Sequence, residues 1–80
     1  MMSNDEKMQI AWQICNVFGK RECQITWDDD PQYDGWCDVL CRYVDLYDLE
    51  QIRKIKDCMY IGSIMSHDYK INIRIDCCEH

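Results

Sequence analysis

The chain of 80 residues is long enough for one domain with one core, and too short for two. Its 48% hydrophobic content and its scarcity of Gly and Pro exclude a disordered tail, and it has no apolar run of the roughly 18 residues that a membrane span requires. The net charge of −6 disfavours direct binding to nucleic acid, because phosphates would be repelled.

The first predicted element is a helix over residues 3–18. Ser3 and Glu6 have the spacing of a capping box, and Gly19 stands where the end of a helix favours a positive φ. Apolar residues recur at helical spacing, but their stripe is wider than one face of a sheet requires. We therefore expect this helix either to be wedged deeply into the core or to meet a partner with part of its stripe. The stripe contains Met8, Ala11, Trp12, Cys15 and Phe18, flanked by Ile10, Ile14 and Val17.

Two strands are predicted next, at residues 22–27 and from about 36 to 44, joined by a turn-rich connection over 28–35. In the first strand, apolar residues alternate with Gln24 and Thr26, as in a half-buried strand. In the second strand, a core face alternates with a mixed face that fits partial contact with water. The core face comprises Cys37, Val39, Cys41 and Tyr43, and the mixed face comprises Trp36, Asp38, Leu40, Arg42 and Val44.

A second helix is predicted from Asp48, which precedes Gln51 by three residues as at a helix start, to the region of Cys58. Its apolar stripe is narrow, so we expect one side to pack on the sheet and the other to face water. The stripe contains Leu49, Ile52, Ile55 and Met59, and the polar side contains Arg53, Lys54 and Lys56.

Two more strands complete the pattern. Residues 60–65 are rich in side chains that favour strands, and residues 71–77 alternate strictly between apolar and polar positions. Residues 66–68 are expected to form the hairpin turn between them. The resulting order is α-β-β-α-β-β, and we predict a small single α+β domain over residues 1–80, with an antiparallel sheet packed against two helices.

The acidic charge is concentrated in one segment. Residues 28–50 contain eight acids and one base, hence a charge of −7, whereas the rest of the chain contains seven acids and eight bases, hence +1. Because a hairpin folds back on itself, these carboxylates should cluster in space as well as in sequence. Aromatic residues are interleaved with them, namely Trp27, Tyr33, Trp36, Tyr43 and Tyr47.

Aromatic anchors ringed by carboxylates are typical of a protein-recognition surface that faces a basic partner. Our leading hypothesis is a non-catalytic protein-binding module, an inhibitor or modulator that docks this hairpin on the basic surface of a larger protein, such as a nucleic-acid-binding protein. A charge run more often forms a solvated face that only confers solubility, which is the simpler alternative. The predicted contact residues are Asp28, Asp29, Asp30, Tyr33, Asp34, Trp36 and Asp38.

A second hypothesis is a small structural or regulatory domain that associates with itself through its sheet edges and the first helix. We expect a homodimer, because association commonly stabilises small domains whose single core is modest. The experimental signature is a dimer mass in solution at tens of micromolar.

The density of cysteines is near that of small secreted disulfide scaffolds, but three features favour an intracellular chain with reduced thiols: the odd number, the start of the chain, and positions among alternating apolar residues. The chain has seven cysteines, an odd number that cannot all pair within one chain. Residues 3–6 are polar and acidic rather than basic, unlike the start of a signal peptide. We therefore expect a cytoplasmic protein in which most thiols are reduced and occupy apolar positions. The cysteines are Cys15, Cys23, Cys37, Cys41, Cys58, Cys77 and Cys78.

Metal binding and catalysis have weaker support. Cys58, Cys77, Cys78 and His80 could converge into a Cys/His metal or redox module, our third hypothesis, but no Cys-x-x-Cys knuckle is present and we expect no cofactor. The acids of residues 28–35 lack the spacing of a calcium loop. Neither of the two histidines stands beside a plausible nucleophile, so we predict no catalytic residue and no enzyme.

Overall fold

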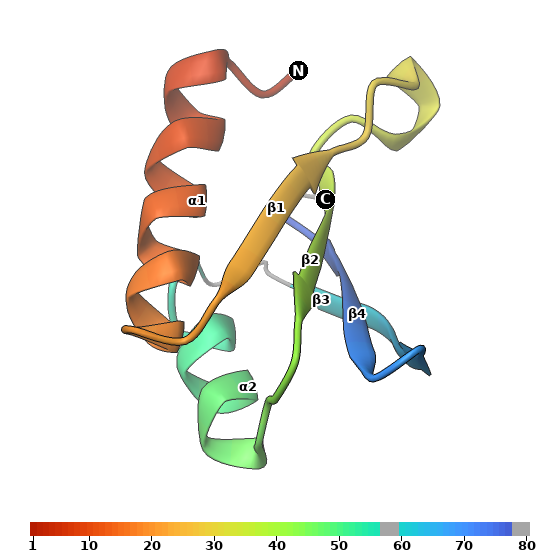
Figure 1. Cartoon of the computed structure of the whole chain (residues 1–80). Helices are drawn as coiled ribbons and strands as arrows, with labels where there is room; N and C mark the ends of the chain where they lie inside the picture. Colours follow the sequence, from red (N-terminus) through yellow and green to blue (C-terminus); the bar gives the residue numbers. More distant parts are fainter. Residues whose placement is uncertain (57–59, 78–80) are drawn as a thin grey trace.

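In the computed structural model, which describes residues 1–56 and 60–77, two helices lie on one side of a four-stranded antiparallel sheet (Figure 1). This arrangement confirms the predicted α+β class and, apart from one added short helix, the predicted order of elements. The elements are α1 (Asn4–Phe18), β1 (Cys23–Trp27), the 3-10 helix η1 (Pro31–Tyr33), β2 (Trp36–Cys41), α2 (Leu46–Arg53), β3 (Tyr60–His67) and β4 (Lys70–Asp76).

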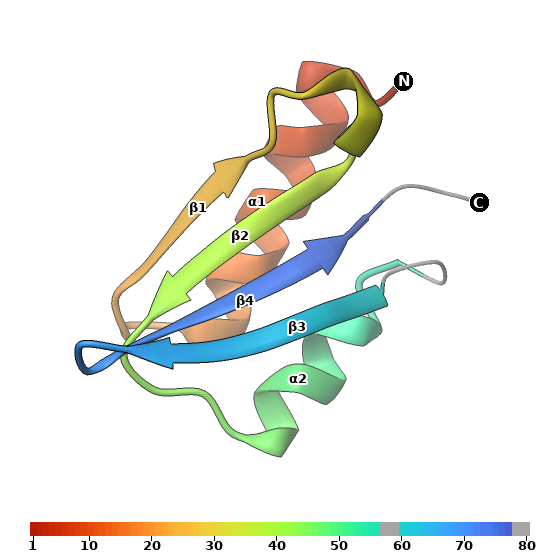
Figure 2. The same ribbon diagram turned by 90° about the vertical axis from the view of Figure 1, so that its right-hand side faces the viewer.

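The strand order in the sheet is β1-β2-β4-β3, so the last strand of the chain joins the β1–β2 hairpin to its own hairpin partner β3. In the β2–β4 pair, Val39 lies opposite Ile73 and Asp38 lies opposite Arg74. The strands stand in front of both helices in Figure 2, with α1 behind β1 and β2 and α2 behind the β3 side. One face of the sheet is therefore covered by helices and the other is open.

Helix α1 begins and ends as its sequence predicts. The Ser3 side chain accepts a hydrogen bond from the Glu6 backbone N–H at 3.2 Å, and Glu6 accepts from Ser3 in return. Gly19 follows the last turn with φ of 63°, a value that glycine adopts without a steric cost. Only part of the apolar stripe is buried, because the sheet covers only the side of the helix that lies against it. Ile10, Ile14 and Phe18 are buried, whereas Met8, Trp12 and Cys15 are exposed.

The connection between β2 and α2 differs from the prediction. Strand β2 ends at Cys41, and Tyr43, expected on the core face, is 58% exposed. Helix α2 begins at Leu46, because Asp45 and Asp48 form their own capping box: Asp45 accepts from the Asp48 N–H at 2.9 Å, and Asp48 accepts from the Asp45 N–H at 3.1 Å. Asp48 is therefore the third residue of the helix rather than its cap. The helix ends at Arg53, and the predicted end at Cys58 lies outside the described residues.

The β3–β4 hairpin turns later than predicted. Strand β3 continues through His67, and the turn consists of Asp68 and Tyr69, with φ of 50° and 62°. Two central residues with positive φ define a type I′ turn, whose twist matches that of the flanking strands. A bulge interrupts the pairing with β4 between Ile61 and Ser63.

The core lies between the helices and the covered face of the sheet. Its side chains come from both helices and from the two central strands, because only those strands have neighbours on both sides. No helix among residues 1–56 and 60–77 is long and apolar enough to cross a membrane. The fully buried residues are Ile14, Cys37, Val39, Ile52, Ile73, Ile75 and Cys77, and Phe18 is 2% exposed.

Candidate functional site

The candidate site lies on the open face of the sheet, at the end where β1 leads into η1. Side chains at alternate positions of a strand point to the same face, so those neighbouring the buried Cys37, Val39 and Ile73 point away from the helices. On the open face, the sheet register places Asp38 of β2 opposite Arg74 of β4. The hairpin acids therefore meet a cation from a strand that is distant in sequence.

Arg74 is the centre of the cluster. Its Nη2 donates to Asp28 Oδ2 at 2.6 Å, and its Nη1 donates to Asp38 Oδ2 at 2.9 Å. The guanidinium carbon also lies 5.6 Å from the ring centre of Tyr33 and 5.2 Å from that of Trp36, within the range of cation–π attraction. Two of the predicted contact acids and both predicted aromatic anchors thus surround one cation. The ion pairs are charge-assisted and directional, so they hold the guanidinium between the two carboxylates, and both rings lie against it.

The carboxylates of the cluster are held by hydrogen bonds, and one of them has a lowered pKa. The hydrogen bond from Arg74, and then the backbone N–H of Asp30, lower the pKa of the Asp28 carboxyl below its ordinary value. Asp38 accepts a further hydrogen bond from Asn72 Nδ2 at 3.0 Å. Both carboxylates are therefore partly neutralised within the domain. Two carboxylates against one guanidinium still leave one negative charge in the cluster.

The other three predicted acids have different surroundings. Asp34 accepts from the Met2 backbone N–H at 2.8 Å and lies 3.7 Å from Lys7 Nζ, so it ties the start of the chain to the hairpin. Asp30 caps η1 by accepting from the Gln32 N–H at 3.0 Å. Asp29 and Asp30 are exposed and form no ion pair with any of the described residues. These two carboxylates are the ones whose charge is fully available to a partner.

The two aromatic residues are held differently. A Cβ atom at Gly62 would lie 2.9 Å from the Trp36 ring, so glycine at this position of β3 leaves room for the indole. Trp36 is accordingly half-buried between Arg74 and Gly62 and packs as part of the sheet surface. Tyr33 stands on η1 above Arg74 and is 44% exposed. Tyr33 is therefore the more accessible anchor of the pair.

The site contains residues that sequence reasoning did not assign to it. Arg74, Asn72 and Lys7 pair with the predicted acids, although none was expected there. The alternation of residues 71–77 does place Asn72 and Arg74 on the polar face of their strand. Nothing in the pattern indicates that this strand lies beside β2, and that neighbour decides the pairing.

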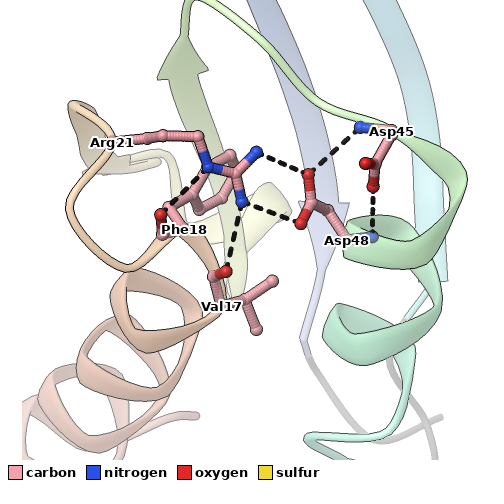
Figure 3. Close-up of polar contacts among 5 residues, drawn as sticks. All are labelled: Val17, Phe18, Arg21, Asp45 and Asp48. Atoms are coloured by element: carbon pink, nitrogen blue, oxygen red, sulfur yellow. Dashed lines mark hydrogen bonds and ion pairs between the residues drawn. The ribbon is translucent and has the colours of Figure 1, made fainter.

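A separate ionic cluster joins the two helices (Figure 3). Arg21 donates to both carboxylate oxygens of Asp48, at 2.7 and 2.8 Å, and to the carbonyls of Val17 and Phe18 at the end of α1, at 3.3 and 3.0 Å. Asp48 is only 3% exposed. The Arg21–Asp48 pair joins the end of α1 to the start of α2, and the other hydrogen bonds of the cluster complete those two helix ends, so we assign it to stability rather than to binding.

The described cysteines occupy two kinds of environment. Cys37, Cys41 and Cys77 are buried, as expected for apolar positions. A hydrogen bond with Cys77, and then burial, raise the pKa of the Cys37 thiol. Cys15 and Cys23 lie at the surface between α1 and β1 with their Sγ atoms 3.5 Å apart. Partial burial and the bond to Cys15 raise the pKa of Cys23 to about 11.

The residues of the predicted metal module cannot be assembled from the described part of the chain. Cys58, Cys78 and His80 lie outside residues 1–56 and 60–77, and Cys77 is buried. Within those ranges, no three His, Cys, Asp or Glu residues form a group that could hold a metal ion.

Comparison of the chain with family models, with curated proteins and with solved structures found no match in any of the three. The fold and its surface define a small α+β domain with an acidic, aromatic end.

Proposed function

We propose that this chain is a non-catalytic protein-binding domain, an inhibitor or modulator that docks the acidic end of its sheet on a basic surface of a larger protein. The observation that supports it best is the position of Tyr33, an exposed aromatic side chain fixed over Arg74 beside the exposed carboxylates of Asp29 and Asp30. An aromatic anchor with charged neighbours is the usual composition of an energetic centre in an interface.

The two parts of this surface have different roles in binding. Asp29 and Asp30 lie at its rim, where charge speeds the encounter with a cationic partner. Tyr33 is already ordered by its contact with Arg74, so less conformational freedom is lost when it enters a partner's pocket. The acids therefore raise the on-rate, and the tyrosine lowers the off-rate.

The chemistry of the surface also indicates the kind of partner. A carboxylate array repels phosphates but can occupy a basic groove in their place. Asp28 and Asp38 are held by Arg74 at defined positions on the strands, as such a substitution requires. A nucleic-acid-binding protein is therefore the partner class that fits best, with the domain covering its basic groove.

Removing the two rim charges should slow association. We expect Asp29→Asn with Asp30→Asn to lower the on-rate for a partner protein recovered from lysate and then purified, and to flatten the dependence of that rate on salt. Kinetics measured by biolayer interferometry at several ionic strengths provide the test. The matched control is Glu22→Gln with Asp68→Asn, which removes the same charge at exposed acids elsewhere. Equal kinetics for the two double variants would contradict the proposal.

Truncating the anchor should speed dissociation instead. We expect Tyr33→Ala to weaken binding of the same partner about 30-fold, equivalent to about 2 kcal/mol, mainly through the off-rate. Tyr69→Ala is the control, because Tyr69 is 98% exposed and lies at the opposite hairpin turn. Thermal melts of both variants separate lost binding from lost folding. An unchanged off-rate in a folded Tyr33 variant would leave this end of the sheet as a solvated face.

A further inference from the structure

Strand β3 is an open edge of the sheet. It pairs with β4 on one side only, and every residue of it except Ile61 is exposed. Natural edge strands are usually protected by charged residues, by proline, by bulges or by a covering element. Residues 60–66 contain no charge and no proline, and the bulge near Ile61 lies at one end. From Ser63 to Ser66 the edge has no charge, proline or bulge, and no element of residues 1–56 and 60–77 pairs with it on its outer side.

The backbone of this edge has free hydrogen-bonding groups. The two residues that flank a two-residue type I′ turn exchange both of their backbone hydrogen bonds, here His67 and Lys70. Because inward and outward groups alternate along a strand, the N–H and C=O of Ser66 and Ile64 point away from β4. They form a short ladder that a fifth strand can join.

An apolar groove lies beside the same edge, on the helix side. Its volume is about 500 Å³, and Ile64 forms one wall and the start of α2 the other. Ile64 is 48% exposed and Leu46 is 79% exposed, so both leave apolar surface in water. A strand added to β3 would place its inward side chains over this groove. The lining residues are Val44, Asp45, Leu46, Leu49, Ile64, Ser66 and Ile71.

We propose that the occupant is a second copy of this chain, paired antiparallel through β3 about a twofold axis at Ile64. In this register Ile64 exchanges both backbone hydrogen bonds with Ile64 of the partner subunit, and the two side chains meet over the grooves. The two four-stranded sheets become one sheet of eight strands. The same short uncharged segment is self-complementary, as a twofold interface requires.

Although the net charge is −6, five of the eight acids of residues 28–50, those of the β1–β2 hairpin, lie away from the proposed contact. These five acids, Asp28 to Asp38, lie two or three strands from β3, hence about 10–14 Å away at the usual spacing of about 4.8 Å. Asp45 is nearer, because it lines the groove itself. In the dimer the acids of the two β1–β2 hairpins are therefore about 25–35 Å apart, at least about three times the roughly 8 Å screening length at physiological salt. No two like charges are paired across the proposed strand contact. The dimer also leaves Tyr33 accessible, so this proposal does not depend on the proposed function.

A charge at the edge should break the dimer. We expect light scattering of the full chain at tens of micromolar to give a dimer mass. Ile64→Lys should raise the dimer dissociation constant at least about tenfold, because it places two like charges directly opposite each other at the twofold axis. Thr26→Lys is the matched control, since it adds the same charge to the exposed face of the other edge strand. Circular dichroism establishes that both variants are folded.

Hydrogen exchange gives an independent measurement. In the dimer the outward amides of Ile64 and Ser66 become bonded, so we expect their protection to increase with protein concentration and to be lost in the Ile64→Lys variant. A monomer mass at every concentration, or a dimer in which these two amides exchange freely, would overturn the proposal. So would protection that appears in a monomer only when another purified protein is added, because the edge would then receive a different partner.

Discussion

Replacement of Asp48 by Asn is expected to lower the free energy of unfolding by about 2–3 kcal/mol and the melting temperature by about 10–20 °C. The carboxylate is 3% exposed and forms two hydrogen bonds of 2.7 and 2.8 Å with Arg21. Arg21 in turn bonds the carbonyls of Val17 and Phe18, which have no partner within α1. The substitution therefore loosens an ion pair and a helix end together (Figure 3). Chemical denaturation measures the effect.

Two exposed acids provide the controls. Asp29→Asn makes the same chemical change at an exposed position, and Glu22→Gln removes an ion pair with Arg42 at 3.8 Å in which both side chains are at least 75% exposed. Exposed pairs contribute about 0–1 kcal/mol, so both variants should unfold close to the unmodified chain. A loss at Asp48 no larger than these would show that the helices are held by apolar packing alone.

The same pair makes stability depend on pH. The hydrogen bonds from Arg21 hold the pKa of Asp48 below its ordinary value, as those from Arg74 do for Asp28. A carboxyl whose pKa is lower in the folded state stabilises the fold fully above its unfolded value of about 3.9, and this contribution is lost as the pH falls through the folded value. Stability should therefore be level between about pH 5 and 7 and fall below about pH 4. The Asp48→Asn variant should show a shallower fall.

Replacement of Ile14 by Ala is expected to have the largest effect on stability, about 3 kcal/mol. Ile14 is fully buried where α1 packs on the sheet, so the change leaves a cavity that the sheet cannot fill without moving. Trp12, two residues earlier in the same helix, is 68% exposed. Trp12→Ala should cost less than about 0.5 kcal/mol in a monomer, because little packing is lost and Ala favours helix. Urea denaturation of both variants at one concentration provides the comparison.

The outcome at Trp12 has a second use. If Trp12→Ala were as destabilising as Ile14→Ala, the exposed side of α1 would have to be covered in solution, as in association through the first helix. The comparison repeated at several protein concentrations separates these cases, because only a covered face makes the cost depend on concentration.

The sequence by itself determined the elements whose signals are local. Ser3, Glu6 and Gly19 define the limits of α1 because a helix end is completed by residues within one turn of it. The alternation in β2 correctly separated Cys37, Val39 and Cys41 from the open face, because successive side chains of a strand point to opposite sides. The local pattern gave a wrong helix start where two residues could act as the cap. Asp48 has the spacing of a cap before Gln51, but Asp45 caps the helix and Asp48 pairs with Arg21.

Only the tertiary structure decided which elements became neighbours. The alternation of residues 71–77 predicts a strand with polar Asn72 and Arg74, yet any of three strands could have lain beside it. Its place next to β2 brings Arg74 to Asp28 and Asp38, so the acidic cluster is partly neutralised and its aromatic rings are fixed. The wide apolar stripe of α1 likewise leaves open which of its residues are buried. Contact with the sheet buries Ile14 and leaves Trp12 exposed. The order of strands and the side of a helix that is buried depend on contacts between residues distant in sequence, which a local pattern does not specify.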